Sequence, residues 1–252
     1  MYPRLAQLGP VTISTYGVLV ALAFLLAVWL ARRAARRMPR ELAPMDEATL
    51  VDWAVWAVLG GLLGGRLFYV LLNWPVYAGS PLEMLALWHG GLVWYGGFLG
   101  GLLATWWHLR RRGIGFLQGA DQVIPFVALG HAVGRIGCFA NGCCFGILQV
   151  IPTQLLESLA LAGLYLALRR GQTPSVLRHP GTLFGWYLIG YALIRGLVEC
   201  WRVNQPMVAN GITLHQAISA ALAAVGLWLV RPAKAIKKVS DTFPARKVSD
   251  TS

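Results

Sequence analysis

Residues Gly134–Gly146 read Gly-Arg-Ile-Gly-Cys-Phe-Ala-Asn-Gly-Cys-Cys-Phe-Gly, and they follow a largely apolar run over residues 123–133. One arginine, one asparagine and three cysteines therefore stand at the end of a segment suited to a membrane. An arginine near hydrocarbon costs roughly 2.5–3.5 kcal/mol on insertion scales, so it needs a partner or a function. Two interpretations stay open: a helix end whose arginine reaches the lipid headgroups, or a site built for a ligand.

The composition of the chain around this segment is that of a membrane protein. Of its 252 residues, 57% are hydrophobic and 13% are charged, and the mean hydropathy is +0.58. Its 11 tryptophans and 8 tyrosines suit the two membrane–water interfaces. The net charge of +12 comes from basic residues that flank apolar segments rather than forming one stripe. We therefore predict no nucleic-acid partner.

Seven apolar segments are each near the length that a helix needs to cross a bilayer. They cover residues 12–31, 49–72, 91–109, 116–137, 153–168, 182–201 and 212–230. Basic residues after the first, third, fifth and seventh segments make up 17 of the 22 Lys and Arg residues. Because basic loops stay in the cytoplasm, the sequence predicts an all-α polytopic membrane protein with about seven transmembrane helices, its N-terminus outside and its C-terminus cytoplasmic. Residues 1–231 form one transmembrane domain, and 232–252 a polar, basic cytoplasmic tail that we expect to be disordered.

Five arginines are not explained by this topology, and such residues are candidates for a functional site. They are Arg4, Arg66, Arg135, Arg195 and Arg202. The alternative for each is a buried structural ion pair. Arg66 follows two Gly-Gly pairs four residues apart, a pattern that favours close helix packing.

The segment 182–201 carries a second polar group. Tyr191, Arg195 and Glu199 are four residues apart in turn, so they project from one side of a helix. Three polar side chains on an apolar helix indicate a groove that holds water or a ligand. The alternative is a self-contained Arg195–Glu199 pair that locks helices together.

These motifs, in this order, resemble the prolipoprotein diacylglyceryl transferases, bacterial membrane enzymes that move diacylglycerol from phosphatidylglycerol onto a lipoprotein cysteine. The resemblance covers about residues 8–231. It rests on five features: Tyr16-Gly17, Gly-Gly-Arg-Leu-Phe-Tyr at 64–69, the glycine-rich stretch 89–100, the segment Gly134–Gly146, and Tyr191 with Arg195, Glu199 and Arg202.

The resemblance implies roles for particular residues. Arg135 falls on the family's essential arginine, which is taken to hold the lipid phosphate, and Arg195 on a second essential arginine. The residues that the resemblance assigns to substrate binding are Arg135, Arg66, Asn141, Tyr16, Tyr191, Gly146 and Arg202. Those that it assigns to catalysis are Arg135, Arg195, Tyr95 and Glu199.

The sequence departs from the family at several of these positions. Tyr95 stands where well-known members have a histidine that is the favoured general base, and a tyrosine with pKa near 10 is a poor base at neutral pH. Cys138 and Cys143 replace an asparagine and a glutamate of many members, and Ile151 replaces a histidine. One subset of the family also carries the tyrosine and the Cys-Cys loop, so these departures resemble a coherent variant.

The resemblance implies transfer of the diacylglyceryl group of phosphatidylglycerol to the lipobox cysteine of prolipoproteins, as a multi-pass protein of the bacterial inner membrane. The expected partners are phosphatidylglycerol, the prolipoprotein signal peptide and membrane lipid. We expect no cofactor and no metal, since the four cysteines lack paired CxxC spacing; a Cys143–Cys144 disulfide stays open. The candidate proton acceptors are Glu199, Tyr95 assisted by an arginine, and the departing phosphate, and we favour the last two together.

Two other classes of function stay open. The first is a lipid-binding relative that keeps the arginine cavity but no longer transfers. The second is a small transporter of anionic solutes, which would be favoured by internal repeats and by polar residues at the midplane of the membrane. No such repeat is present in 1–231, and the polar residues lie toward segment ends.

Overall fold

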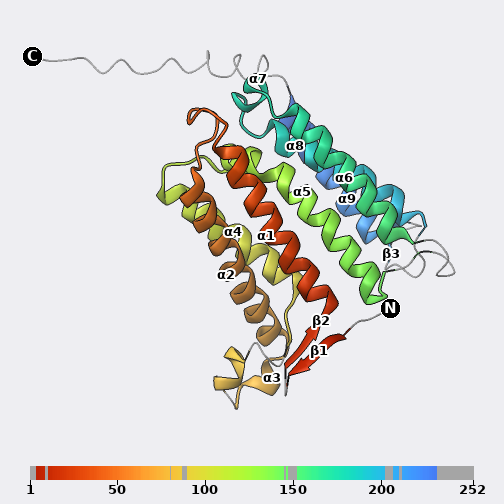
Figure 1. Ribbon diagram of the computed structural model, residues 1–252. Coiled ribbons are helices and arrows are strands. Elements are labelled where there is room, and N and C mark those ends of the chain that lie inside the picture. The colour runs from red at the N-terminus through yellow and green to blue at the C-terminus, as the bar shows by residue number, and fades with distance from the viewer. Residues whose placement is uncertain are drawn as a thin grey trace, which may run out of the picture.

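The structure is a computed structural model that describes residues 4–8, 11–79, 81–86, 90–144, 146, 152–201, 207–209 and 212–231. Its body is a bundle of long helices that run roughly side by side (Figure 1). The long helices are α1 (Thr15–Ala35), α2 (Glu47–Leu72), α4 (Trp94–Arg111), α5 (Phe116–Asn141), α6 (Thr153–Gly171), α8 (Thr182–Glu199) and α9 (Leu214–Val230). The short ones are α3 (Trp74–Tyr77), the 3-10 helix η1 (Pro81–Leu85) and α7 (Pro174–Leu177).

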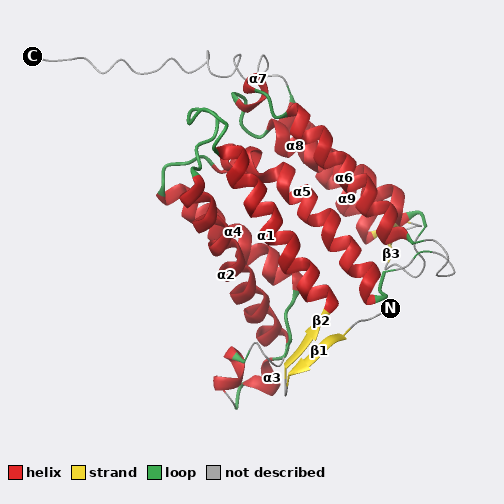
Figure 2. Ribbon diagram, viewed as in Figure 1, coloured by secondary structure: helices red, strands yellow, loops and turns green. Residues whose placement is uncertain are grey.

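Two small antiparallel strand pairs accompany the helices, and the sequence did not lead us to expect them (Figure 2). Strand β1 (Arg4–Leu8) pairs with β2 (Val11–Ser14), with Arg4 opposite Ser14 and Leu8 opposite Val11. Strand β3 (Met207–Ala209) pairs with β4 (Ile212–Thr213), with Met207 opposite Thr213. Each pair leads directly into a long helix. The prediction of an all-α protein therefore holds for the bundle, and the two strand pairs have to be added to it.

Each of the seven predicted apolar segments coincides with one long helix among the described residues, of 17 to 26 residues each. Three of these helices, α1, α2 and α5, are long and apolar enough by length and composition to cross a membrane. Helix α9 is apolar but has 17 residues. Helices α6 and α8 contain charged residues that lower their hydropathy. Of these, Glu157 of α6 and Arg195 and Glu199 of α8 belong to the site described below.

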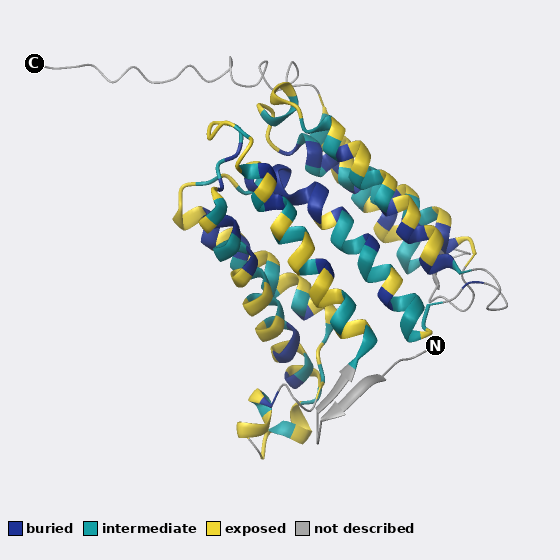
Figure 3. Cartoon of the chain, in the orientation of Figure 1, coloured by how far each residue is buried: buried dark blue, intermediate teal, exposed yellow. Residues whose placement is uncertain are grey.

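Many residues on the long helices are exposed (Figure 3), and large apolar residues are among them. Leu25 of α1, Leu63 of α2 and Leu103 of α4 are each more than 60% exposed. An apolar surface of this extent does not suit water and is typical of a face that contacts lipid. Helix α5 is the central element, because it packs against α1, α6 and α8.

Glycines set the distance between α2 and α4. A Cβ atom built on Gly60 would lie 2.5 Å from the Gly100 carbonyl oxygen, and one on Gly64 would meet the Gly96 carbonyl oxygen even more closely. The two glycine-rich segments of the sequence therefore pack against each other. This confirms the close helix packing that the spacing of the α2 glycines predicts.

We expect Gly100→Ala to destabilise the folded protein by about 1–3 kcal/mol, because an added methyl group in a packed interface forces the backbones apart. The new Cβ would lie 2.9 Å from the Gly64 Cα and closer still to the Gly60 carbonyl oxygen. Denaturant unfolding of the purified protein in detergent measures the effect. The matched control is Gly163→Ala in α6, where a Cβ meets no atom within 4 Å. Equal midpoints for the two variants would contradict this account of the packing.

Polar side chains fix the helix ends and the loops. The Thr49 backbone N–H donates to the Asp46 carboxylate at 2.8 Å, which caps α2 and lowers the pKa of Asp46. At the start of α8, the backbone N–H groups of Gly181 and Phe184 donate to the Asp121 carboxylate of α5, at 2.7 and 2.8 Å. A carboxylate suits this place because a helix N-terminus carries partial positive charge. Asp121 thus fixes α8 against α5 at the end of the bundle opposite the strand pairs.

Candidate active site

Two buried arginine–carboxylate pairs lie at one end of the bundle. Arg135 on α5 contacts Glu157 on α6 at 2.8 Å, and their side chains are 16% and 2% exposed. Arg195 contacts Glu199 one turn further along α8 at 2.9 Å, and these side chains are 6% and 0% exposed. Charged groups this deeply buried are stable only when they are paired and hydrogen-bonded. Glu157, a charged residue inside an apolar segment, has this partner in Arg135.

Helix positions explain why these four side chains meet. Arg135 lies in the last two turns of α5, Glu157 in the first two turns of α6, and Arg195 in the last two turns of α8. Since α6 packs against both α5 and α8, the three helix ends bring the charges together. The Ser158 hydroxyl donates to the Ala132 carbonyl at 2.8 Å and holds α6 against α5 one turn away from the pair.

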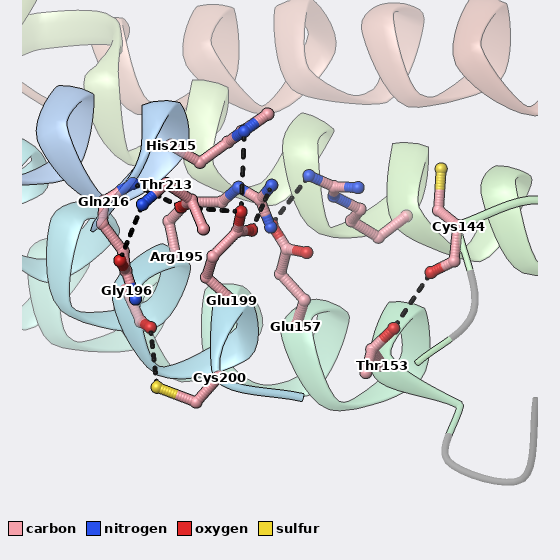
Figure 4. Close-up of polar contacts among 11 residues, drawn as sticks. Cys144, Thr153, Glu157, Arg195, Gly196, Glu199, Cys200, Thr213, His215 and Gln216 are labelled. Carbon is pink, nitrogen blue, oxygen red and sulfur yellow. Dashed lines mark hydrogen bonds and ion pairs between the residues drawn. The ribbon is translucent and has the colours of Figure 1, made fainter. Parts of the chain in front are cut away.

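Glu199 also joins α8 to α9. The Thr213 hydroxyl donates to the Glu199 carboxylate at 3.0 Å, and the His215 Nδ1 lies 3.6 Å from the same carboxylate oxygen. Thr213 caps α9 as well, since its hydroxyl accepts from the Gln216 backbone N–H at 3.2 Å. Figure 4 shows Glu199 surrounded by Arg195, Thr213 and His215, with Glu157 reaching toward this group from α6. The carboxylate therefore bridges two helices rather than standing alone.

Tyr191 joins the two arginine pairs. Its hydroxyl is close enough to Arg135, Arg195 and Glu157 to interact electrostatically with all three. The His131 ring lies 5.2 Å from the Tyr191 ring, and the Tyr187 ring stacks on Tyr191 at 6.0 Å. His131 and Arg135, one turn apart on α5, both lie next to Tyr191. Tyr191 is thus the point where α5, α6 and α8 meet.

An apolar cavity of about 380 Å³ opens beside this cluster. Side chains of α1, α2, α5 and α8 line it, among them Val20, Phe24, Trp53, Phe126, His131 and Tyr187. Its size lies within the range usual for small-molecule sites, and His131 and Tyr187 connect it to the arginine pairs. An elongated apolar ligand with a charged end fits a cavity of this kind.

Three further residues that were predicted to bind substrate lie near the end of α5: Tyr16, Asn141 and Gly146. Gly137 faces the Tyr16 ring, to which an added Cβ would approach at 3.2 Å, so a side chain at 137 would displace the tyrosine. Tyr16 is 42% exposed at the first turn of α1. Asn141 is the last residue of α5, and Gly146 is buried. Arg202, the predicted tail 232–252 and Ile151 lie outside the described residues.

Arg66 makes a different set of contacts. Its guanidinium donates to the carbonyl oxygens of Glu83, Met84 and Gly90 at 2.7, 2.9 and 2.6 Å. Its positive charge also lies over the rings of Tyr69 and Tyr77, at 5.5 and 5.3 Å. Arg66 therefore anchors Glu83, Met84 and Gly90 to α2. Its contact with a lipid phosphate stays a prediction.

Tyr95 stands apart from the two arginine pairs in the contacts of the described residues. It lies in the first turn of α4, is 56% exposed, and packs edge-on against Trp94 at 5.3 Å between ring centroids. Helix α4 packs mainly on α2, away from α6 and α8. The catalytic role of Tyr95 therefore stays a prediction, whereas Arg135, Arg195, Glu199 and Tyr191 are brought together.

Thr213 and His215 belong to this site but were not among the site residues predicted from the sequence. Both are close to Glu199 because α9 packs against α8 through Gly185 and Gly226, where an added Cβ would meet a carbonyl oxygen of the other helix at 2.9 and 2.7 Å. The available signal was a helix-capping pattern, Thr213 followed by Gln216. That pattern predicts where a helix begins but not which carboxylate lies opposite.

Membrane-length helices and an arginine–carboxylate cluster beside an apolar cavity define a helical membrane protein. The family model described as prolipoprotein diacylglyceryl transferase matches residues 3–231, and the chain belongs to this family of transferases. Similar relatives are named phosphatidylglycerol–prolipoprotein diacylglyceryl transferase. The one from Synechococcus elongatus is 36% identical over 89% of this chain and 85% of its own length. Those from Gluconacetobacter diazotrophicus and an Azoarcus species are 33% and 35% identical, over 93% and 92% of this chain and 92% and 94% of their own lengths.

Proposed function

We propose that this chain transfers the diacylglyceryl group of phosphatidylglycerol to the thiol of the lipobox cysteine of prolipoproteins, the first step of bacterial lipoprotein maturation. The relatives' names supply the two substrates. The observation that carries the proposal is the position of Arg135, a guanidinium only 16% exposed, close to a second arginine and next to an apolar cavity. This arrangement matches a lipid with an anionic headgroup.

The lipid enters from the membrane with its acyl chains in the apolar cavity and its phosphate at the arginines. A guanidinium binds phosphate through two parallel hydrogen bonds. Glu157 contacts one terminal nitrogen of Arg135 and thereby orients the guanidinium. In this proposal Tyr191, Asn141 and Tyr16 supply further polar contacts to the headgroup. We assign Glu157 to positioning, since it acts through Arg135.

The chemistry is a displacement at carbon. The sulfur of the lipobox cysteine attacks the glyceryl carbon of the diacylglyceryl group, and the bond from that carbon to the phosphate oxygen breaks. A thioether forms and glycerol 1-phosphate leaves with the bonding electron pair. Arg135 and Arg195 stabilise the charge that develops on this phosphate, in a buried site where such stabilisation is large. The reaction requires no redox partner.

The cysteine must lose its proton to become a good nucleophile. Of the three candidate acceptors, Glu199 is already engaged by Arg195 and Thr213. Proton transfer to the departing phosphate requires no further side chain at the reacting atoms. We therefore retain the departing phosphate as the acceptor, with Tyr95 as the assisting group once the prolipoprotein is bound.

We further propose seven transmembrane helices, the N-terminus outside and the C-terminus in the cytoplasm, in the bacterial inner membrane. Support comes from the arrangement of the helix ends. Arg135, Glu157, Arg195 and Tyr16 all lie toward the end of the bundle that carries the strand pairs, whereas the basic segments after α1 and α4 lie at the other end (Figure 1). The site therefore faces the outer leaflet, where a secreted prolipoprotein emerges.

Reporter fusions test this orientation. A green fluorescent protein fused after Ser252 is expected to fluoresce, because it stays in the cytoplasm. Alkaline phosphatase fused in the segment after Trp201 is expected to be active, because it is exported. The reverse pattern, with a silent fluorescent fusion and an inactive phosphatase at the second position, would overturn the topology.

Complementation tests the function. The chain is expressed in cells depleted of their own transferase, and the mass of a reporter lipoprotein is followed. The expected result is an added diacylglyceryl group, absent when the reporter's lipobox cysteine is replaced by serine. An inserted, folded protein that adds no mass would overturn the proposal.

The second candidate is a lipid-binding relative without transfer. It is favoured by one observation: both arginines of the cluster are paired with carboxylates, Glu157 and Glu199, as in a purely structural network. Such a protein binds phosphatidylglycerol vesicles but leaves the reporter unmodified, so the same experiment distinguishes the two.

A further inference from the structure

Three cysteine thiols converge at the end of α5. The Sγ atoms of Cys138, Cys143 and Cys144 all lie within 4.8 Å of one another, and those of Cys143 and Cys144 are 3.6 Å apart. Two sulfurs bound to one zinc ion at about 2.3 Å are at most about 4.6 Å apart. Small side-chain rotations are enough to bring all three to that spacing.

The backbone that presents these thiols is held in an unusual shape. Gly142, the residue that caps the C-terminus of α5, has a left-handed φ of 75°, and the Cys143 N–H donates back to the Cys138 carbonyl at 3.1 Å. Cys144 then has φ 67°, and among the described residues it is the one non-glycine residue in the left-handed region. A left-handed conformation is unfavourable for a side chain with a Cβ, and such strain is concentrated at ligand sites.

Two buried side chains of α6 fix this turn from the other side. The Thr153 hydroxyl donates to the Cys144 carbonyl at 3.0 Å, and the Gln154 side-chain amide donates to the Cys143 carbonyl at 2.5 Å. Thr153 and Gln154 are each 1% exposed. The turn is therefore anchored at both cysteines before any ligand binds.

We propose that Cys138, Cys143 and Cys144 form a three-thiolate site for a soft metal ion with a filled d shell, Cu(I) or Zn(II). Three sulfur donors select such ions over Mg²⁺ or Ca²⁺, which prefer oxygen. Three sulfurs complete a trigonal Cu(I) site, or leave Zn(II) a fourth position for water. Each thiol that binds loses a proton to solvent, and neither the sulfur nor the metal changes oxidation state.

A positive charge next to the three cysteines favours their thiolate forms. Three thiolates with a monovalent or divalent ion carry net negative charge, and the Arg135 guanidinium is close enough to Cys138 and Cys144 to interact with them electrostatically. The sequence carries no zinc signature, because the cysteine spacings of five residues and one residue match no paired CxxC pattern. The helix end, not the spacing, brings the sulfurs together.

Metal titration of the full chain tests this site without any measurement of lipidation. The purified protein in detergent is reduced with a phosphine under anaerobic conditions. Cu(I) and, separately, Zn(II) are then titrated against a chromogenic chelator. We expect one ion bound per chain, and affinity weaker by at least about 100-fold when Cys138→Ser, Cys143→Ser or Cys144→Gly removes a thiol.

The variants are chosen to separate binding from folding. Cys144→Gly removes the thiol while glycine accepts the left-handed backbone, so its fold is retained. Cys200→Ser is the matched control, since Cys200 is an exposed thiol at the end of α8, outside the cluster, and it is expected to bind like the wild type. The proposal is overturned if neither ion binds or if Cys144→Gly binds as tightly as the wild type. It is also overturned if Cys143 and Cys144 form a disulfide that the phosphine does not open, seen as two thiols that cannot be alkylated.

Discussion

Arg135→Ala is expected to abolish diacylglyceryl transfer. The substitution removes the guanidinium that we place on the lipid phosphate, where charge accumulates as glycerol 1-phosphate leaves. Loss of one such donor typically costs roughly 100- to 1,000-fold in rate. The measurement is the initial rate of thioether formation, with phosphatidylglycerol vesicles and a signal peptide carrying the lipobox cysteine, followed by mass spectrometry.

Two companion variants make this result specific. Arg135→Lys keeps a positive charge but loses the two parallel donors, so we expect it to recover only part of the rate. Arg178→Ala removes an exposed arginine after the short helix α7 and is expected to transfer like the wild type. Arg135→Ala also removes the ion-pair partner that Glu157 has at 2.8 Å, so unfolding is measured in parallel. A folded Arg135→Ala protein with wild-type rates would exclude Arg135 from the reaction.

The sequence predicted the helical body well, for a physical reason. A bilayer demands long apolar helices, and all seven predicted segments match helices among the described residues. Glycine pairs in two segments also predicted close packing, which α2 and α4 show. The strand pairs were missed because they are short and adjoin helices, where hydrophobic periodicity gives almost no signal.

The site was predicted in part. Arg135, Arg195 and Glu199 stood out because a charged residue in an apolar segment requires an explanation. Which carboxylate meets which arginine depends on how α5, α6 and α8 pack, and no local pattern gives that. Arg66 illustrates the limit, since the same reasoning marked it as a ligand for phosphate and gave no sign that its guanidinium also donates to the carbonyl oxygens of Glu83, Met84 and Gly90. Its contact with phosphate stays a prediction.

The Arg195–Glu199 pair has two interpretations that a pair of variants separates. Glu199→Leu alone leaves Arg195 in the bundle without the carboxylate that it contacts at 2.9 Å. Breaking a buried pair from one side typically costs about 3–5 kcal/mol. We therefore expect a large drop in the denaturant midpoint of Glu199→Leu, together with loss of transfer.

The double variant Arg195→Met with Glu199→Leu replaces both charges by apolar groups of similar volume. Such replacements are often neutral or stabilising, so the free energy of unfolding is expected to return to near the wild-type value. Thr213 loses the Glu199 carboxylate but keeps its capping bond to the Gln216 N–H. If Arg195 binds the phosphate, transfer stays at least about 100-fold below wild type although the fold is restored. If the pair serves only to join α8 to α9, activity returns together with stability. The difference between the two recoveries therefore measures what Arg195 does beyond holding the helices, and equal recovery of both would remove it from the reaction.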